Sequence, residues 1–214
     1  MVHLMDRICA KNKKAARMVS QSQKGALFTV DWEDFYHALT PFEDWWQYED
    51  RIEEPTYWLL DTLDKFKVKA HWYILGALIE RHHELIWEIV RRGHTVGSHG
   101  WYHTHNESEG HLLDLECKKR LRALVGQCEG FRSPYWDCSP RPGYSSGAFF
   151  RILPLSFVKK EIMKYGVFGI HPHDLDAGQP RIKGAPFWRY WGLKGARQKL
   201  VKLLQEIEWT SIQK

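Results

Sequence analysis

The sequence predicts a single α/β domain in which parallel strands alternate with helices. Short apolar, β-prone runs at 26–30, 70–75, 95–98 and 167–170 are separated by segments with helical periodicity. A βαβαβαβ order favours a parallel sheet or barrel with its helices outside. The chain has 214 residues, of which 43% are hydrophobic and 27% charged, so it fits one globular domain and excludes a disordered or collagen-like chain.

Three helices are predicted between the first four strands. The first covers 55–66, where Pro55 suits the first helical turn. The second runs over 76–93 and ends with basic residues in its last turn and a glycine as the stop signal. The third, over 112–126, also ends at a glycine. A short strand-like stretch at 130–132 should follow.

The last third of the chain is less regular. Prolines and a glycine crowd the loop over 134–143, and a helix is predicted over 156–164. After the strand at 167–170, a connection rich in proline and glycine leads to a closing amphipathic helix, whose apolar face carries the leucines and isoleucine of 200–207.

The positive charge is concentrated at the start of the chain. Residues 1–24 carry six basic side chains and one acid, which gives +5 and equals the net charge of the whole chain. We therefore predict a flexible basic segment over 1–24 and a neutral catalytic domain over 25–214, without a nucleic-acid-binding face. No apolar run reaches the ~18 residues of a membrane span. We expect a cytoplasmic protein, with contact of the basic segment at the inner face of the membrane as the alternative.

Acids and histidines follow three of the predicted strands. Asp31 and Asp34 follow the first strand, His99 and His103 follow the third, and His171 follows the last. The carboxyl ends of parallel strands meet at one edge of the sheet, where α/β folds carry their chemistry. Two histidines four residues apart and one carboxylate can bind a catalytic zinc-like ion and leave positions open for water and substrate.

Four motifs, in this order along the chain, carry a resemblance to a known family. They are DWED at 31–34, GHTVGSHGWYH at 93–103, RSPY at 132–135 and IHP at 170–172. From residue 26 to the C-terminus the chain resembles the polysaccharide deacetylases (NodB homology, carbohydrate esterase family 4), in particular the branch associated with exopolysaccharide and O-antigen clusters. The resemblance implies a deformed (β/α) barrel. The barrel should be shortened, because only eleven residues separate Tyr135 from Gly147.

The resemblance also implies a metal centre. Asp34, His99 and His103 would bind Zn²⁺ or another divalent transition metal, and Asp31 would be the general base. Strand alternation complicates this assignment, since Asp31 and Glu33 share one face and Asp34 lies on the other unless a turn begins at Glu33. Glu33 therefore remains an alternative to Asp31 as the base or to Asp34 as the ligand.

Further roles follow from the same resemblance. Arg132 would pair with the base carboxylate. The backbone N–H of Tyr135 would complete an oxyanion hole, and His171 would be the general acid. Trp101 and Trp136, with Tyr135, would bind a sugar ring through their flat aromatic faces.

The function implied is metal-dependent removal of acetyl from an N-acetylated amino sugar during synthesis of a bacterial surface polysaccharide or O-antigen. The partner of His171 is left open between Asp174 and Asp176. Two rivals remain: an amidohydrolase acting on a small non-sugar amide, and a relative that binds metal and glycan without turnover. A second subunit that supplies the missing strands is a further expectation.

Overall fold

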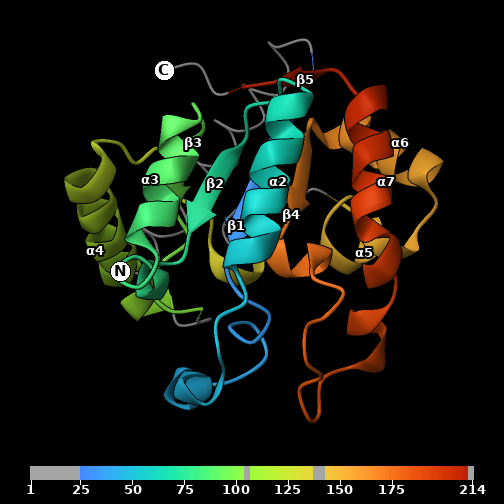
Figure 1. Ribbon diagram of the computed structural model, residues 1–214. Helices are drawn as coiled ribbons and strands as arrows, with labels where there is room; N and C mark the ends of the chain where they lie inside the picture. Colours follow the sequence, from blue (N-terminus) through green and yellow to red (C-terminus); the bar gives the residue numbers. More distant parts are fainter. Residues whose placement is uncertain (1–24, 104–106, 137–142, 212–214) are drawn as a thin grey trace.

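A parallel β-sheet forms the centre of the computed structural model, which describes residues 25–103, 107–136 and 143–211 (Figure 1). Four strands follow the order β3-β2-β1-β4, and a short fifth strand also pairs with β1. Every strand pairing is parallel, which confirms the predicted α/β fold. The strands are β1 (Ala26–Trp32), β2 (His71–Ile74), β3 (Thr95–Ser98), β4 (Val167–Ile170) and β5 (Trp209–Thr210).

Helices cover the sheet and connect its strands. In the view of Figure 1, α2 lies across the front of the sheet, with α7 to one side and α3 and α4 to the other. The α-helices are α2 (Glu53–Lys65), α3 (His83–Arg91), α4 (Glu107–Val125), α5 (Gly147–Ile152), α6 (Leu155–Tyr165) and α7 (Leu193–Glu206). Short 3-10 helices are η1 (Phe42–Gln47), η2 (Gly76–Leu78), η3 (Pro134–Trp136), η4 (Pro172–Leu175) and η5 (Phe187–Tyr190).

The predicted helix over 76–93 is divided into η2 and α3. The backbone N–H groups of Gly76 and Ala77 donate to the carbonyl oxygens of Gly100 and Trp101, which lie on a different loop. The next N–H groups, of Leu78 and Ile79, donate to the carbonyl oxygens of Leu75 and Gly76 in 3-10 fashion, and α3 begins only at His83. The strand predicted over 130–132 is reduced to an isolated bridge between Ser98 and Phe131. Helix α5 and strand β5 were not predicted.

Strand β1 is buried on both faces, as expected for the central strand of a parallel sheet. Phe28, Val30 and Trp32 lie in the hydrophobic core, where the Trp32 indole N–H donates to Thr56 Oγ1 over 3.0 Å. The alternate positions of the strand carry Thr29 and Asp31 toward the candidate site. One strand thus anchors the core with one face and presents polar groups with the other. The predicted boundary at residue 24 lies outside the described residues.

None of the helices in the described part of the chain combines the length and the apolar character needed to cross a membrane.

Candidate active site

The candidate site lies at the carboxyl edge of the sheet. Asp31 and Glu33 come from the end of β1, His99 follows β3, and His171 follows β4. The structure brings these groups together, since His171 Nε2 lies 3.8 Å from Asp31 Oδ2 and 3.7 Å from Glu33 Oε1. The predicted convergence of the strand ends is therefore present in the fold.

Glu33, His99 and His103 form a cluster suited to a metal ion. One ligand atom from each lies within 4.8 Å of the other two. Glu33 Oε2 lies 3.1 Å from His103 Nε2, and both side chains are almost fully buried. Two histidines and one carboxylate are a common donor set for catalytic zinc, which leaves coordination positions open.

The donor atoms of this cluster carry lone pairs that face one another. Burial lowers the pKa of His99, and it lowers the pKa of His103 well below the usual range, so both rings are neutral near pH 7. His99 Nδ1–H donates to the Arg132 carbonyl over 2.8 Å, which leaves Nε2 of the neutral ring as an electron-pair donor. Glu33 Oε2 is buried and accepts no hydrogen bond from the described residues. Burial raises the pKa of Glu33 to about 7, so this carboxylate favours a proton or another positive partner. A divalent cation would take the place of that proton and satisfy all three donors.

Asp34, the carboxylate predicted as a metal ligand, points away from this cluster. Its Oδ1 accepts a hydrogen bond from the N–H of Phe35 over 2.7 Å, and its Oδ2 accepts one from the N–H of Arg51 over 2.5 Å. Burial raises the pKa of Asp34 to about 6 despite these two bonds. Asp34 fixes the loop between β1 and α2, and the geometry favours the Glu33 alternative for the metal.

Asp31 occupies the position expected of a general base. Arg132 Nη1 donates to Asp31 Oδ1 over 2.5 Å and to Thr29 Oγ1 over 3.0 Å. Burial alone would raise the pKa of Asp31, but the Arg132 guanidinium, with His99 and His171, lowers it below its ordinary value. The Arg132 guanidinium also lies over the Tyr73 ring, 4.0 Å from its centroid. Asp31 is therefore held as a carboxylate in a fixed orientation.

His171 is held by Asp174, which settles the choice between the two aspartates suggested as its partner. His171 Nδ1 lies 2.8 Å from Asp174 Oδ2, and the same oxygen accepts the backbone N–H of His171. Burial opposes protonation of His171, but Asp174, Glu33 and Asp31 together raise its pKa above the ordinary value. Asp176 is instead paired with Arg51, 2.6 Å from Arg51 Nε.

Arg151 is a residue that the sequence did not indicate. Its Nε lies 2.9 Å from Asp174 Oδ1, an ion-pair distance without the alignment of a hydrogen bond, and its Nη1 donates to the Trp191 carbonyl over 2.7 Å. Arg151 and Asp174 are both buried. No local pattern predicts this pair, because α5 and η4 meet only through tertiary packing.

Two backbone features shape the loops around the site. Gly100 has φ +78°, a left-handed conformation that lets the chain turn between His99 and His103. Tyr135 has φ 56° although it is not a glycine. Such strain, of order 1–3 kcal/mol, is concentrated at functional sites. The loop that was predicted to supply the oxyanion donor therefore has an unusual backbone at that residue.

Of the two tryptophans predicted to bind sugar, the structure describes the side chain of Trp101 alone. Trp101 packs against the hydrophobic core and over Gly76, where an added Cβ would lie 2.7 Å from the indole ring. The side chain of Trp136 lies outside the described part of the chain. A cavity of about 650 Å³ opens instead beside His103 and Tyr135, and it is lined mainly by the loop over 38–45 and by Tyr102.

Two segments of the chain match known protein families. Residues 35–139 match the model of the polysaccharide deacetylase family, and residues 140–214 match a domain of unknown function (DUF3473). The match to the polysaccharide deacetylase family covers 105 of the 214 residues, just under half of the chain. His99, His103, Arg132 and Tyr135 lie inside this first match, whereas Arg151, His171 and Asp174 lie inside the second.

Two curated relatives of this chain are named peptidoglycan-N-acetylglucosamine deacetylase and come from Bacillus cereus. One is 30% identical over 84 residues, which cover 37% of this chain and 30% of the relative. The other is 29% identical over 104 residues and covers 46% of each chain. The chain thus spans less than half of the length of the curated relatives it matches.

Solved structures support the same fold at low sequence identity. The peptidoglycan deacetylase PdaC from Bacillus subtilis aligns with a TM-score of 0.53 and 15% identity, over 89% of this chain and 87% of PdaC. A peptidoglycan N-acetylglucosamine deacetylase in complex with a benzamide derivative gives 0.55 and 17%, with 88% and 86% coverage. A pseudoenzyme of carbohydrate esterase family 4 from Bacillus anthracis gives 0.55 and 13%, with 89% and 64% coverage. These likenesses concern the fold alone.

Proposed function

We propose that the chain is a metal-dependent N-deacetylase that hydrolyses the acetamide of an N-acetylated sugar. One observation carries the proposal: His171 lies within 4 Å of both Asp31 and Glu33, beside two neutral histidines that complete a donor set for a metal with Glu33. Amide hydrolysis needs a base for the attacking water, an acid for the leaving amine and a positive charge for the oxyanion. A divalent ion held by Glu33, His99 and His103 supplies Lewis acidity to the carbonyl and acidifies water.

The first step is attack on the acetamide carbonyl. Asp31 accepts a proton from the water as its oxygen bonds to the carbonyl carbon. Arg132 keeps Asp31 ionised and fixes its rotamer, because the pair is buried and hydrogen-bonded. The backbone N–H of Tyr135 donates to the oxygen that becomes negatively charged.

The second step breaks the C–N bond. His171 donates its proton to the departing nitrogen, and acetate and the free amine are the products. Asp174 accepts from His171 Nδ1, which directs the proton on Nε2 toward the reacting atoms. Burial opposes protonation of His171, but the neighbouring carboxylates raise its pKa on balance, which favours the protonated ring that a general acid requires.

The cavity beside His103 gives the sugar a place to bind. Its volume of about 650 Å³ exceeds that of one pyranose ring, and the rings of Phe42, Trp45 and Tyr102 contribute to its wall. Aromatic faces beside a polar centre suit the apolar face of a sugar. The names of the curated relatives support N-acetylglucosamine as the amino sugar.

The biological setting belongs to the same proposal. We infer a bacterial surface polysaccharide or O-antigen as the glycan, a zinc-like ion as the metal, and action on the cytoplasmic side of the membrane. The resemblance of 73–76, 147–154 and 176–182 to the exopolysaccharide branch supports this setting. Turnover is favoured over glycan binding alone because each proton-transfer group has a charged partner. Arg132 pairs with the base Asp31, and Asp174 pairs with the acid His171.

Acetate release tests the proposal. Zinc-loaded protein should release acetate from N-acetylglucosamine oligomers, and Asp31→Asn should lower kcat by about 10²–10⁴-fold with its metal content unchanged. Trp87→Ala, on the exposed side of α3, is the control and should keep full activity. Release only from small non-sugar amides would favour the amidohydrolase rival. Metal binding without release from any N-acetylated compound would contradict the enzymatic proposal.

A further inference from the structure

The segment over 180–194, between η4 and α7, presents large aromatic side chains to solvent. Phe187 is 67% exposed, Trp188 45% and Trp191 52%. Exposed aromatic side chains in one short segment mark an interaction surface more often than an accident of folding. None of the three belongs to the proton-transfer or metal-binding groups described above, so the proposed chemistry does not explain them.

The same segment carries positive charge without any acid. Arg181, Lys183, Arg189 and Lys194 lie within its fifteen residues, and no acidic residue occurs between Asp176 and Glu206. Arg181, Lys183 and Lys194 are exposed. Aromatic rings combined with lysine and arginine are the side chains that proteins place at the interface of an anionic membrane.

The segment is internally braced. The N–H of Ile182 donates to the hydroxyl oxygen of Tyr190 over 2.8 Å, and the Arg181 guanidinium lies 5.4 Å from the centroid of the Tyr190 ring. Ile182 is buried and anchors the base of the loop. The exposed aromatic residues are therefore held outside by an ordered backbone, and their exposure is a fixed property of the fold.

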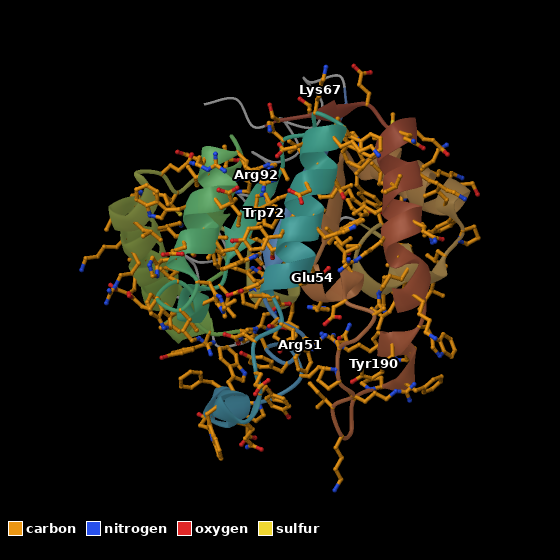
Figure 2. The ribbon with its side chains drawn as sticks, viewed as in Figure 1. Arg51, Glu54, Lys67, Trp72, Arg92 and Tyr190 are labelled. Atoms are coloured by element: carbon orange, nitrogen blue, oxygen red, sulfur yellow. The ribbon has the colours of Figure 1, made fainter. Side chains whose placement is uncertain are left out.

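The position of the segment suits a flat partner. In Figure 1 it protrudes from the carboxyl edge of the sheet, the same edge that carries the candidate site, and Figure 2 marks Tyr190 on this protrusion. A protruding surface fits a plane better than it fits a narrow chain. Arg189 links the segment to the site, since its guanidinium lies 3.4 Å from His173 Nε2.

We propose that residues 180–194 dock onto the surface of an anionic lipid bilayer, with Phe187, Trp188 and Trp191 entering the interface and the basic side chains contacting lipid phosphates. Charge complementarity selects this partner: three exposed cations, Arg181, Lys183 and Lys194, attract the negative surface of a membrane, and the segment carries no acid. The proposal does not depend on the deacetylase activity. It is also distinct from a contact through the basic segment at 1–24.

Cosedimentation of the full chain with vesicles tests the proposal. Vesicles of phosphatidylglycerol and phosphatidylcholine in equal parts should bind the protein, whereas pure phosphatidylcholine should bind it at least about tenfold more weakly. The Phe187→Ala, Trp188→Ala double variant should lower the partition coefficient about tenfold or more. Lys183→Gln and Lys194→Gln should each lower it about fivefold, and added salt should weaken binding of the wild type.

Trp46→Ala is the matched control. Trp46 is 81% exposed on η1 at the same edge of the sheet, but its segment is acidic, with Glu43 and Asp44 beside it. This variant should bind vesicles as the wild type does. The basic segment at 1–24 is present in every variant, so a difference between variants reports on the loop. Equal binding by the wild type and the double variant, with both folded by circular dichroism, would overturn the proposal, as would an equal loss in Trp46→Ala.

Discussion

The two halves of the site shift the pKa of their histidines in opposite directions. In the half that matches the deacetylase family, His99 and His103 are buried, and burial lowers the pKa of both rings. In the half that matches the domain of unknown function, the His171 side chain is 20% exposed, and Asp174, Glu33 and Asp31 raise its pKa against the effect of burial. Neighbouring charge thus makes one histidine a proton donor, while burial makes the other two electron-pair donors.

The comparison shows that residues 140–214 complete the site and do not form a separate unit. Strand β4 of this half pairs with β1, and the histidine that follows β4 reaches the carboxylates that follow β1. In the sequence, Asp31 and Glu33 precede both family matches. In space, Glu33 lies between the histidines of the first half and His171 of the second. We expect variants of the metal-binding residues, Glu33, His99 and His103, to lose the metal. Variants of His171 and Asp174 should keep the metal and have a lower kcat.

The largest effect is expected at Glu33. Glu33→Gln removes a negative ligand from the donor set, so zinc content should fall to near zero and kcat/KM should fall by about 10³-fold or more. Elemental mass spectrometry of the purified protein measures the first value, and acetate release measures the second.

Asp34→Asn is the matched control for Glu33→Gln. Asp34 accepts hydrogen bonds from the N–H groups of Phe35 and Arg51, so its variant should lose about 1–3 kcal/mol of stability and keep its metal. Loss of zinc in Asp34→Asn and retention in Glu33→Gln would return the ligand role to Asp34.

A smaller effect is expected at Asp174 in the second half. Asp174→Asn leaves the size of the side chain unchanged but removes the charge that orients and protonates His171. Metal content should stay at the wild-type level while kcat falls about 10²–10⁴-fold. Asp176→Asn, on the neighbouring aspartate that pairs with Arg51, should change kcat little. Loss of metal in Asp174→Asn would contradict the division between the two halves.

Arg151 should have a more modest effect, since it acts through Asp174. Arg151→Met should lower kcat about tenfold and leave KM within about twofold, and Arg151→Lys should recover part of the rate. Removing one partner of a buried ion pair costs about 3–5 kcal/mol, so the thermal unfolding midpoint must be measured in parallel. A loss of stability with an unchanged kcat in the folded fraction would make Arg151 purely structural.

The smallest effect lies outside the site, in the scaffold of the first half. Burial lowers the pKa of His82, but Asp50, 2.8 Å from its Nε2, and Glu53 raise it above the ordinary value on balance. The stability from this pair is fully present below the unfolded pKa of about 6.5, and it is lost as the pH rises through the folded pKa. We expect less than about 1 kcal/mol, because Glu53 is exposed. Urea unfolding of the wild type and His82→Gln from pH 5 to pH 9 checks this, and parallel curves would contradict it.

Much of the fold was predictable because its signals are local. Helical periodicity, glycine stop signals and apolar runs predicted a helix at the positions of α2, α3, α4, α6 and α7. They also predicted four of the five strands. The division of the helix over 76–93 was not predictable, because the apolar residues keep a helical spacing across the break between η2 and α3. Strand β5 has only two residues, Trp209 and Thr210, which is too short for any periodicity.

The sequence identified most residues of the candidate site, but it left the roles of the acids after β1 open. Strand alternation places Asp31 and Glu33 on one face, and the structure follows that rule. The preference for Asp34 required a turn at Glu33 that would bring its carboxylate inward. Instead, the N–H groups of Phe35 and Arg51 hold that carboxylate, and the Arg51 contact joins residues seventeen positions apart. Such a contact leaves no trace in local sequence.

Arg132 touches both the base and a metal-binding histidine. Its guanidinium holds Asp31, and its own carbonyl oxygen accepts the N–H of His99. A single residue thus sets the spacing between the group that removes a proton and the group that binds the metal. Side-chain substitution of Arg132 changes the base alone, whereas a one-residue insertion before it would displace both partners at once. The length of the segment between His99 and Arg132 is therefore a constraint on the base and on the metal site together.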